Sequence, residues 1–421
     1  MIFYFMQVQS IDLSIEYVSV SLLYIKYKNL PSWIVFLFTL SVVLITLVSV
    51  IFPALIMGSG EFKYKVDIFE FGILAFPLLL TNAIIFCLFF LYSKRFLPIT
   101  IPMVIRRVFS FEVSAQVATL VVILLLGFYI SFNINELLVK DPWEDYERTV
   151  LPALENWEVG NITKNITEPN LVYLFGIISL KIFGTYHAIA FIASIAVVVL
   201  TYFITKEISG KRFSGLVAIA VLLQSNNFLT YDTTLTYSNF WVLFYLLSLY
   251  LIYKKWQLSP ISFLFSIPSK AITIMYLPMN LFFAYRVNIP RRKKILIFSS
   301  YIAIIVIGTI IFVVSGTGLS RIQEFNSHSF LSGLTAFSAE FRFDFLIVLF
   351  ILPLIVGLFF ASRNGFLEAD AIMILLGWIL LLSAILPAFT EFDNNPYRYI
   401  TFVVFFAVGT GLLFSKVKQP T

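Results

Sequence analysis

The stretch ILIFSSYIAIIVIGTIIFVVS, residues 295–315, decides the fold of this chain. It has no charged residue over its 21 positions, and apolar side chains would occupy every face of a helix formed from it. An α-helix needs about 20 residues to cross the hydrocarbon core of a bilayer. A helix that is apolar all round needs apolar surroundings on every side. The stretch therefore predicts a membrane-spanning helix.

Nine other segments have a similar composition and predict further spans. They cover residues 33–57, 71–91, 113–132, 186–205, 213–228, 238–253, 345–361, 371–387 and 399–414. Of the 421 residues, 60% are hydrophobic and 12% are charged, whereas about a quarter of the residues in a soluble domain are charged. We therefore expect an all-α, polytopic helical membrane protein.

Residues 260–285 predict a short hairpin between two of these spans. Basic residues flank the segment on both sides, so both ends should face the same compartment. A break is expected at residues 268–270, where a proline, a serine and a lysine follow one another. Each arm would be about 20 Å long as an α-helix, which is too short to cross the membrane.

The distribution of charge predicts the orientation. With the N-terminus inside, 19 of the 29 lysines and arginines fall on the inner face and 8 on the outer face, leaving Lys181 and Lys270 unassigned. Of the 23 acidic residues, 17 fall outside. Basic residues are enriched on the cytoplasmic side of membrane proteins, so both termini should be cytoplasmic, in the plasma membrane. Membrane lipid then accounts for the net charge of +6, and no nucleic acid partner is expected.

The longest outer loop, residues 133–185, is acidic and predicts two helices at the membrane surface. Val150, Leu154 and Trp157 recur at helical spacing, with glutamates between them. This pattern is typical of an amphipathic helix lying on the membrane. Residues 171–183, bounded by a proline and a glycine, predict a second interfacial helix.

The segment KDPWEDYER, residues 140–148, carries the first candidate chemistry. Asp141, Glu144 and Asp145 lie beside the aromatic Trp143. A carboxylate here could act as a general base on an acceptor hydroxyl. Asp141 and Asp145 could also bind a divalent cation such as Mg²⁺ or Mn²⁺, and a mechanism without a metal is equally compatible with the sequence. The alternative is an acidic, solvated loop with an interfacial tryptophan.

Two further outer segments hold candidate binding residues. Tyr231 and Asp232 lie in a short outer turn between spans, where Asp232 could also serve as a helix cap. The segment EFDNNPYRY precedes the last span and contains four candidates, namely Glu391, Asp393, Arg398 and Tyr399.

Arg398 and Lys270 are the candidate cationic ligands of a phosphate. Arg398 begins a span, where its guanidinium needs an anionic partner, and it could hold a phosphate through two hydrogen bonds. It could instead extend to lipid headgroups. Lys270 lies near the turn of the short hairpin, where a bound phosphate would stabilise its charge, unless the turn reaches water.

Taken in order, residues 113–414 resemble the GT-C superfamily of membrane glycosyltransferases. The similar elements are the acidic residues 141–145, the helix 171–184 ending in Phe-Gly, the span 186–205, the basic turn 210–213, the Tyr231-Asp232 turn, the lysine-containing hairpin 260–285 and the Pro-Tyr-Arg-Tyr segment 396–399. The Trp-Trp-Asp-Tyr-Gly motif of oligosaccharyltransferases is missing. The resemblance divides the chain into residues 1–112, with two extra helices, and a GT-C-like transmembrane module at residues 113–421.

The resemblance implies a glycosyltransferase that uses a polyprenyl-phosphate-linked sugar. A carboxylate of the first outer loop would deprotonate an acceptor hydroxyl on the outer side of the membrane, with Asp141 the first choice and Glu144 and Asp145 the others. Arg398 and Lys270, with Tyr399, would hold the donor phosphate. Tyr231, Asp232, Glu391 and Asp393 would contact substrate; the acceptor is not specified.

Two other classes of function fit the sequence. A secondary transporter would have many spans and a broken hairpin, but transporters place ionisable residues near the membrane midplane, and these spans are almost free of charge. A catalytically silent relative could be a structural subunit of a membrane complex, with the two N-terminal helices as its docking surface.

Overall fold

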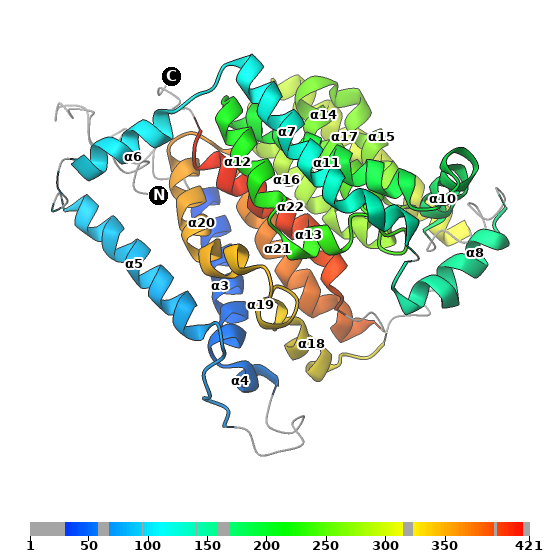
Figure 1. Cartoon of the computed structure of the whole chain (residues 1–421), viewed down its shortest axis with the longest axis horizontal. Helices are drawn as coiled ribbons and strands as arrows, with labels where there is room; N and C mark the ends of the chain where they lie inside the picture. The colour runs from blue at the N-terminus through cyan, green and yellow to red at the C-terminus, as the bar shows by residue number, and fades with distance from the viewer. Residues whose placement is uncertain are drawn as a thin grey trace. The chain divides into compact units, whose positions relative to one another are not determined.

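A computed structural model gives the fold of the chain (Figure 1). The structure describes residues 30–57, 67–94, 96, 98, 100–139, 141–158, 169–314, 323–390 and 394–415. This part is helical and contains no strand. Six of its helices are long and apolar enough to cross a membrane: α3 (Leu30–Ile51), α5 (Ala75–Ser93), α7 with its extension (Ala115–Leu138), α11 (Ala188–Ser209), α20 (Phe345–Arg363) and α21 (Glu368–Phe389). The expectation of an all-α polytopic membrane protein is confirmed.

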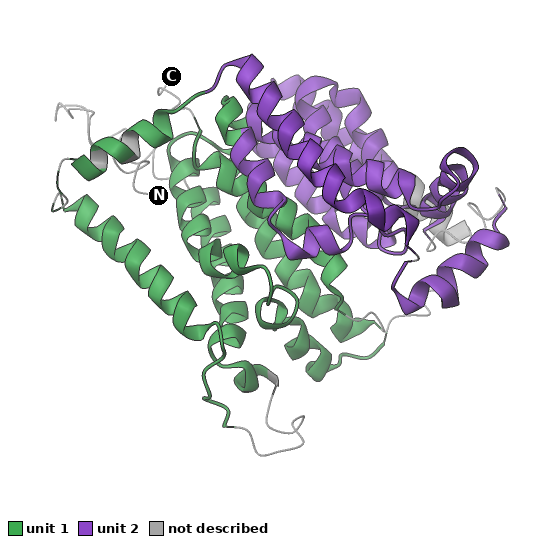
Figure 2. Cartoon of the chain, viewed as in Figure 1, with its two compact units in different colours: residues 1–112, 208–214, 321–421 green, residues 113–207, 215–320 purple. Residues whose placement is uncertain are grey.

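The chain forms two compact units, coloured separately in Figure 2. Unit 1 comprises residues 1–112, 208–214 and 321–421, and unit 2 comprises residues 113–207 and 215–320. The chain passes from unit 1 to unit 2 between residues 112 and 113, where the division expected from the sequence begins its second module; that division stays a prediction. The C-terminal helices, which that division groups with the second module, pack with the N-terminal helices in unit 1.

Unit 1 is built around α3, α20, α21 and α22 (Ile400–Leu412). Helix α3 packs against α20 and α21, and α22 packs against the same two helices. Nearly every residue of α22 is buried. Because other helices surround it, the apolar side chains on all its faces have apolar neighbours. Ser32 at the start of α3 donates a 2.7 Å hydrogen bond to the buried carboxylate of Asp370, and Thr39 donates to the backbone oxygen of Met373. Helix α5, which packs against α20, also belongs to the unit. So do the short helices α4 (Pro53–Met57), α6 (Thr100–Ser110), α18 (Ser327–Gly333) and α19 (Ala336–Ala339).

Unit 2 contains α7 (Ala115–Asn133), α10 (Asn170–Phe183), α11, α14 (Phe240–Lys254) and α17 (Arg291–Val314). Between α14 and α17 lie two short helices, α15 (Ser259–Ser266) and α16 (Leu277–Arg286), joined through a 3₁₀ turn at Ala271–Tyr276. The break expected at residues 268–270 is therefore present, and neither arm is long enough to span a bilayer.

Polar side chains fix this hairpin inside unit 2. Asn280 of α16 donates to Ser248 of α14 and to the hydroxyl of Tyr301 of α17, both at 3.0 Å. The Tyr301 hydroxyl also pairs with Ser259 of α15 at 3.0 Å. In apolar surroundings such hydrogen bonds hold helices together and fix which helix faces pair, which apolar packing alone specifies only weakly.

The segment 213–228, expected to be a single span, forms two helices. Helix α12 (Arg212–Leu222) ends, and Ser225 then caps α13 (Asn226–Thr230) by accepting a 3.2 Å hydrogen bond from the amide of Phe228. Serine competes well for backbone amides at a helix start. The polar pair Gln224 and Ser225 therefore separates two helices, and hydropathy alone did not indicate this.

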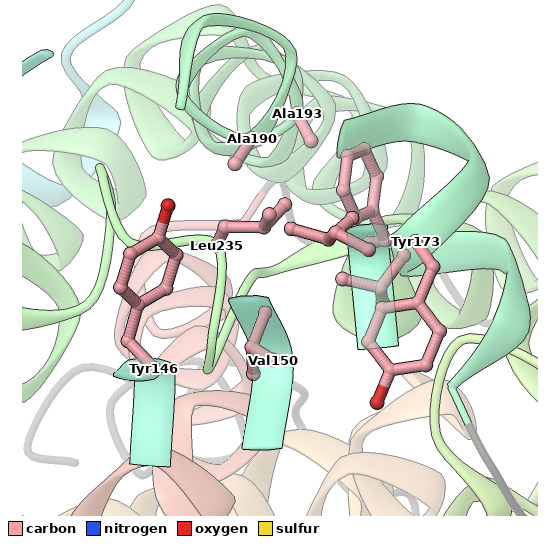
Figure 3. Close-up of a cluster of buried hydrophobic side chains, with 9 residues drawn as sticks. Tyr146, Val150, Tyr173, Ala190, Ala193 and Leu235 are labelled. Atoms are coloured by element: carbon pink, nitrogen blue, oxygen red, sulfur yellow. The ribbon is translucent and has the colours of Figure 1, made fainter. Parts of the chain in front are cut away.

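The loop of residues 133–185 forms helices where they were expected, but their apolar face is covered by protein. A π-helical turn (Tyr146–Val150) continues into α8 (Leu151–Glu155), and α10 follows. Val150 and Leu154 are buried in a cluster with Tyr173 of α10 and with α11. In Figure 3, Leu235 lies between Val150 and Ala190. The expectation that Val150 and Leu154 face lipid is corrected accordingly: a helix with one apolar stripe can cover a neighbouring helix as well as a membrane.

Candidate functional site

Asp141 organises one end of unit 2 by holding the turn that follows α13. Its Oδ2 accepts hydrogen bonds from the backbone amides of Leu235 and Thr236 at 3.2 and 3.3 Å, and from the Thr236 hydroxyl at 2.9 Å. Its Oδ1 accepts from the amide of Trp143 at 3.4 Å. The side chain is 5% exposed. Asp141 therefore ties residues 235–236 to the acidic segment, and its oxygens are already engaged.

Aromatic rings close this connection. Trp143 stacks on Tyr231, with ring centroids 5.0 Å apart, and meets Tyr237 edge-on at 5.4 Å. Tyr231 and Tyr237 also meet edge-on at 5.7 Å. Such aromatic pairs contribute about 1 kcal/mol each beyond the burial of their area. Trp143 is thus a structural partner of the turn, a role different from that of an isolated interfacial tryptophan.

Asp145 faces the same turn but remains exposed. The Tyr237 hydroxyl donates a 2.6 Å hydrogen bond to its Oδ2. The ammonium of Lys270, at the break of the hairpin, lies 5.9 Å from the centre of the Tyr237 ring. An acidic, an aromatic and a basic side chain from three separate segments thus meet at one end of unit 2.

Glu144, the remaining carboxylate of the acidic segment, points to a different partner. It forms an ion pair with Arg148, one helical turn later, and both side chains are about 70% exposed. Exposed pairs of this kind contribute little to stability. Glu144 therefore has no contact with the turn in the described structure.

Asp232 is the centre of a buried polar cluster beside this turn. It is 1% exposed, and its Oδ2 accepts a 3.1 Å hydrogen bond from Asn133 at the end of α7. Burial raises the pKa of the Asp232 carboxyl to about 7, and the negative charge of Glu136 adds to the effect, while hydrogen bonds from Tyr129 and Thr233 oppose it. Glu136 in turn accepts a 2.9 Å hydrogen bond from the Thr233 hydroxyl.

His187, just before α11, lies at the same end of unit 2. It is 7% exposed, and burial lowers its pKa, whereas the negative charge of Asp141 opposes that effect. Its ring lies 5.9 Å from that of Tyr146. Burial also raises the pKa of the Tyr146 hydroxyl to about 12. A neutral imidazole close to Asp141 adds a polar group without adding positive charge.

The candidates before the last helix belong to unit 1. Arg398 lies half-buried in the turn Pro396–Tyr399, with its guanidinium 5.8 Å from the centre of the Tyr397 ring. Tyr399 is buried and meets Phe341 edge-on at 5.1 Å, so it is a core residue. Glu391 and Asp393 lie outside the described residues.

Glu340 is an acidic neighbour of Arg398 that the sequence did not single out. Burial raises the pKa of the Glu340 carboxyl to about 7, against the opposing positive charges of Arg342 and Arg398. Glu340 and Arg398 thus interact electrostatically within unit 1; the anionic partner expected for Arg398 stays a prediction.

Five candidates predicted from the sequence lie at one end of unit 2, namely Asp141, Asp145, Tyr231, Asp232 and Lys270. The sequence did not single out Tyr237, His187 or Glu340. Tyr237 was visible as an aromatic beside the candidate turn, but its partners come from segments distant in sequence. His187 carried no motif, and its burial between Tyr146 and Asp141 is a property of the fold.

The carboxylate of Asp141 does not fit a divalent cation. Amide and hydroxyl hydrogens point at the oxygens of Asp141, occupying the positions that a cation would take. In the described part of the chain, no group of three or more His, Cys, Asp and Glu side chains is placed to hold a metal ion. The arrangement supports chemistry by proton transfer and charge contact.

Comparisons with known proteins return no family model, no curated protein and no solved structure that matches this chain.

Proposed function

We propose that this chain is a membrane glycosyltransferase that moves a sugar from a polyprenyl-phosphate-linked donor to an acceptor hydroxyl. The observation that carries the proposal is the meeting of Asp145, Tyr237 and Lys270 at one end of unit 2. Such a reaction needs a base for the acceptor and a cation for the phosphate, and this arrangement offers both. The GT-C resemblance in the order of segments supports the same reading.

In this mechanism Asp145 is the general base. Its carboxylate takes the proton of the acceptor hydroxyl, and the oxygen attacks the anomeric carbon of the sugar. The bond between that carbon and the phosphate oxygen breaks, and polyprenyl phosphate leaves with the bonding electrons. Asp145 suits the role because it is exposed and retains an oxygen, Oδ1, for the acceptor. The Tyr237 hydroxyl fixes the other oxygen.

Asp141, the first choice from the sequence, is assigned a positioning role in this proposal. Its four hydrogen bonds leave little capacity to accept an acceptor proton. It holds the turn that carries Tyr237, and Tyr237 in turn orients Asp145. Its loss would therefore act on the reaction through the shape of the site.

Lys270 is the proposed phosphate contact. It is half-buried near the break of a hairpin whose arms are too short to span the bilayer. A cation there gains from an anionic ligand, and charge-assisted contacts of this kind are the strong ones. Arg398 of unit 1 is the second candidate for binding phosphate.

The decisive experiment measures two quantities in purified protein. Binding of a polyprenyl phosphate is followed by tryptophan fluorescence, and sugar release is followed with a panel of labelled polyprenyl-phosphate sugars. Asp145→Asn should reduce turnover by roughly 10²–10⁴-fold with binding retained, as expected for loss of a general base. Glu155→Gln, an exposed carboxylate of α8, is the matched control and should be unaffected.

Failure of the wild-type protein to bind any polyprenyl phosphate would refute the proposal. Uptake of a solute into proteoliposomes, without lipid binding, would support the transporter class in its place.

The proposal also requires the acidic loop to lie outside, with both termini in the cytoplasm. In a Cys87→Ser background, Glu155→Cys and Lys293→Cys should react with an impermeant thiol reagent from opposite sides of the plasma membrane. Reaction of both from the outside would contradict this topology.

A further inference from the structure

Helix α6 is an amphipathic helix whose apolar face has no cover in the described structure. Ile101, Val104 and Val108 recur at i, i+3 and i+7, which places them on one stripe of the helix. They are 41%, 62% and 46% exposed. An exposed stripe of this kind needs an apolar partner. The sequence analysis assigned these residues to no element.

The C-terminal end of α6 is fixed to unit 1. The ammonium of Lys211 donates to the backbone oxygen of Phe109 at 2.5 Å. The Phe109 ring stacks on Phe414 at 4.8 Å, and Phe213 meets Phe414 edge-on at 5.7 Å. The helix is therefore held at a defined place in unit 1, and in Figure 1 it runs across the direction of α20.

The neighbouring helix α5 indicates what surrounds α6. Only Ala75, Leu78 and Asn82 of its 19 residues are buried, and large side chains such as Phe76 and Phe90 are more than half exposed. A 19-residue apolar helix with so little protein around it must face lipid. Helix α6 begins seven residues after α5 ends, so its start is tethered close to the end of a span.

Charge indicates the kind of lipid. Lys94 ends α5, Arg106 and Arg107 lie within α6, and Arg107 is exposed. Lysines and arginines beside a span are attracted to anionic phospholipids. A helix with a basic face and an apolar stripe lies in the plane of the membrane surface.

From these observations we infer that α6 is an in-plane helix that binds a membrane surface containing anionic phospholipid. Ile101, Val104 and Val108 enter the acyl region, and Arg107 contacts headgroup phosphates. This surface is separate from the proposed catalytic residues, which lie in unit 2, and the inference does not depend on the proposed function.

Spin labels on opposite sides of α6 test the position of the helix. In a Cys87→Ser background, Val108→Cys and Ser110→Cys place a label on the apolar stripe and about 160° away from it, because successive residues are about 100° apart. The full chain is reconstituted into phosphatidylcholine vesicles containing phosphatidylglycerol. The label at residue 108 should be more accessible to oxygen dissolved in lipid, and that at residue 110 to a water-soluble nickel chelate.

Two outcomes would overturn the inference. Protection of residue 108 from both reagents would show that protein, such as another part of this chain or a second copy, covers the stripe. Access of the nickel chelate to residue 108 would show that α6 lies in water.

A second measurement tests the preference for anionic lipid. Spin-labelled phosphatidylglycerol and phosphatidylcholine are compared for association with the reconstituted protein. Arg107→Gln should reduce the preference for phosphatidylglycerol by up to roughly fivefold, the factor that corresponds to one basic residue at the membrane surface. Arg148→Gln, an exposed arginine of unit 2, is the control and should leave the preference unchanged. An equal preference for phosphatidylglycerol in Arg107→Gln and wild type would show that Arg107 does not bind anionic lipid.

Discussion

The two ends of the acidic segment, four residues apart, are built differently. Asp141 is buried and accepts four hydrogen bonds, three of them from the turn at residues 235–236. Asp145 is exposed and accepts one hydrogen bond, from the hydroxyl of Tyr237. A carboxylate with every oxygen satisfied serves structure, whereas one that is exposed and partly satisfied can exchange a proton. The number of donors around a carboxylate, more than its place in a motif, separates the two roles.

Removal of the Asp141 carboxylate should have the largest effect, a loss of stability of the folded protein. Asp141→Ala leaves the amides of Leu235 and Thr236 and a hydroxyl without their acceptor in a buried position. Each unsatisfied group costs about 1–3 kcal/mol, so the total loss is about 5 kcal/mol, enough to deplete the folded protein. The fraction of monodisperse protein after heating in detergent measures the loss.

Asp141→Asn distinguishes the contribution of the hydrogen bonds of Asp141 to stability from that of its negative charge. The asparagine keeps one oxygen that can accept two of the donors, so it should be of intermediate stability. Equal stability of wild type, Asp141→Asn and Asp141→Ala would show that the difference between the two ends is not structural.

The fold class and the helices within residues 133–185 could be predicted from the sequence because hydropathy and spacing act locally. The long apolar runs contain about as many residues as a helix needs to cross a bilayer. Pro169 and Gly184 mark the bounds of α10. The role of Asp141 could not be predicted in the same way. Its partners Leu235 and Thr236 are more than 90 residues away, and nothing in the acidic segment tells which carboxylate the fold will bury.

The exposed apolar stripe of α6 was missed for a related reason. Pro102 and the two arginines lower the mean hydropathy of residues 100–110, so no span is indicated. The i, i+3, i+7 spacing of Ile101, Val104 and Val108 was the signal that could have revealed it.

A dependence of stability on pH should reveal the titration of the buried Asp232. Burial raises the pKa of its carboxyl in the folded protein from 3.8 to about 7. The unfolded chain releases this proton at lower pH than the folded protein does, so the contribution of Asp232 is fully present below about pH 4. It is lost as pH rises to about 7. Each pH unit in that interval corresponds to about 1.4 kcal/mol, which gives at most about 4 kcal/mol.

Asp232→Asn removes this titration and isolates it from other groups. The stability of the variant relative to wild type should rise between pH 4 and 7 and stay level above 7. Thermal unfolding across that interval provides the measurement. A constant difference between the two proteins would show that Asp232 does not carry the raised pKa.

Substitution of Lys270 tests whether a cation near Asp145 contributes to binding of the donor phosphate. Lys270→Gln should weaken binding of polyprenyl phosphate by roughly tenfold, at the lower end of the value of a contact to a charged group, while sugar transfer at saturating donor falls less. Lys181→Gln, an exposed lysine of α10, is the matched control. Equal losses of affinity in the two variants would show that Lys270 acts only through the general charge of the surface and does not contact the phosphate.

The smallest expected effect concerns Tyr237, which links the two ends. Tyr237→Phe keeps the ring that packs on Trp143 and lies below Lys270, and it removes only the hydroxyl that donates to Asp145. Loss of one such hydrogen bond is worth about 1 kcal/mol, so turnover should fall roughly fivefold while thermal stability and binding of polyprenyl phosphate stay at wild-type values. Tyr237→Leu removes the ring as well and should add losses of stability and lipid binding. If the two variants behave alike in all three measurements, the hydroxyl does not orient Asp145, and Tyr237 belongs with Asp141 among the structural residues of the turn.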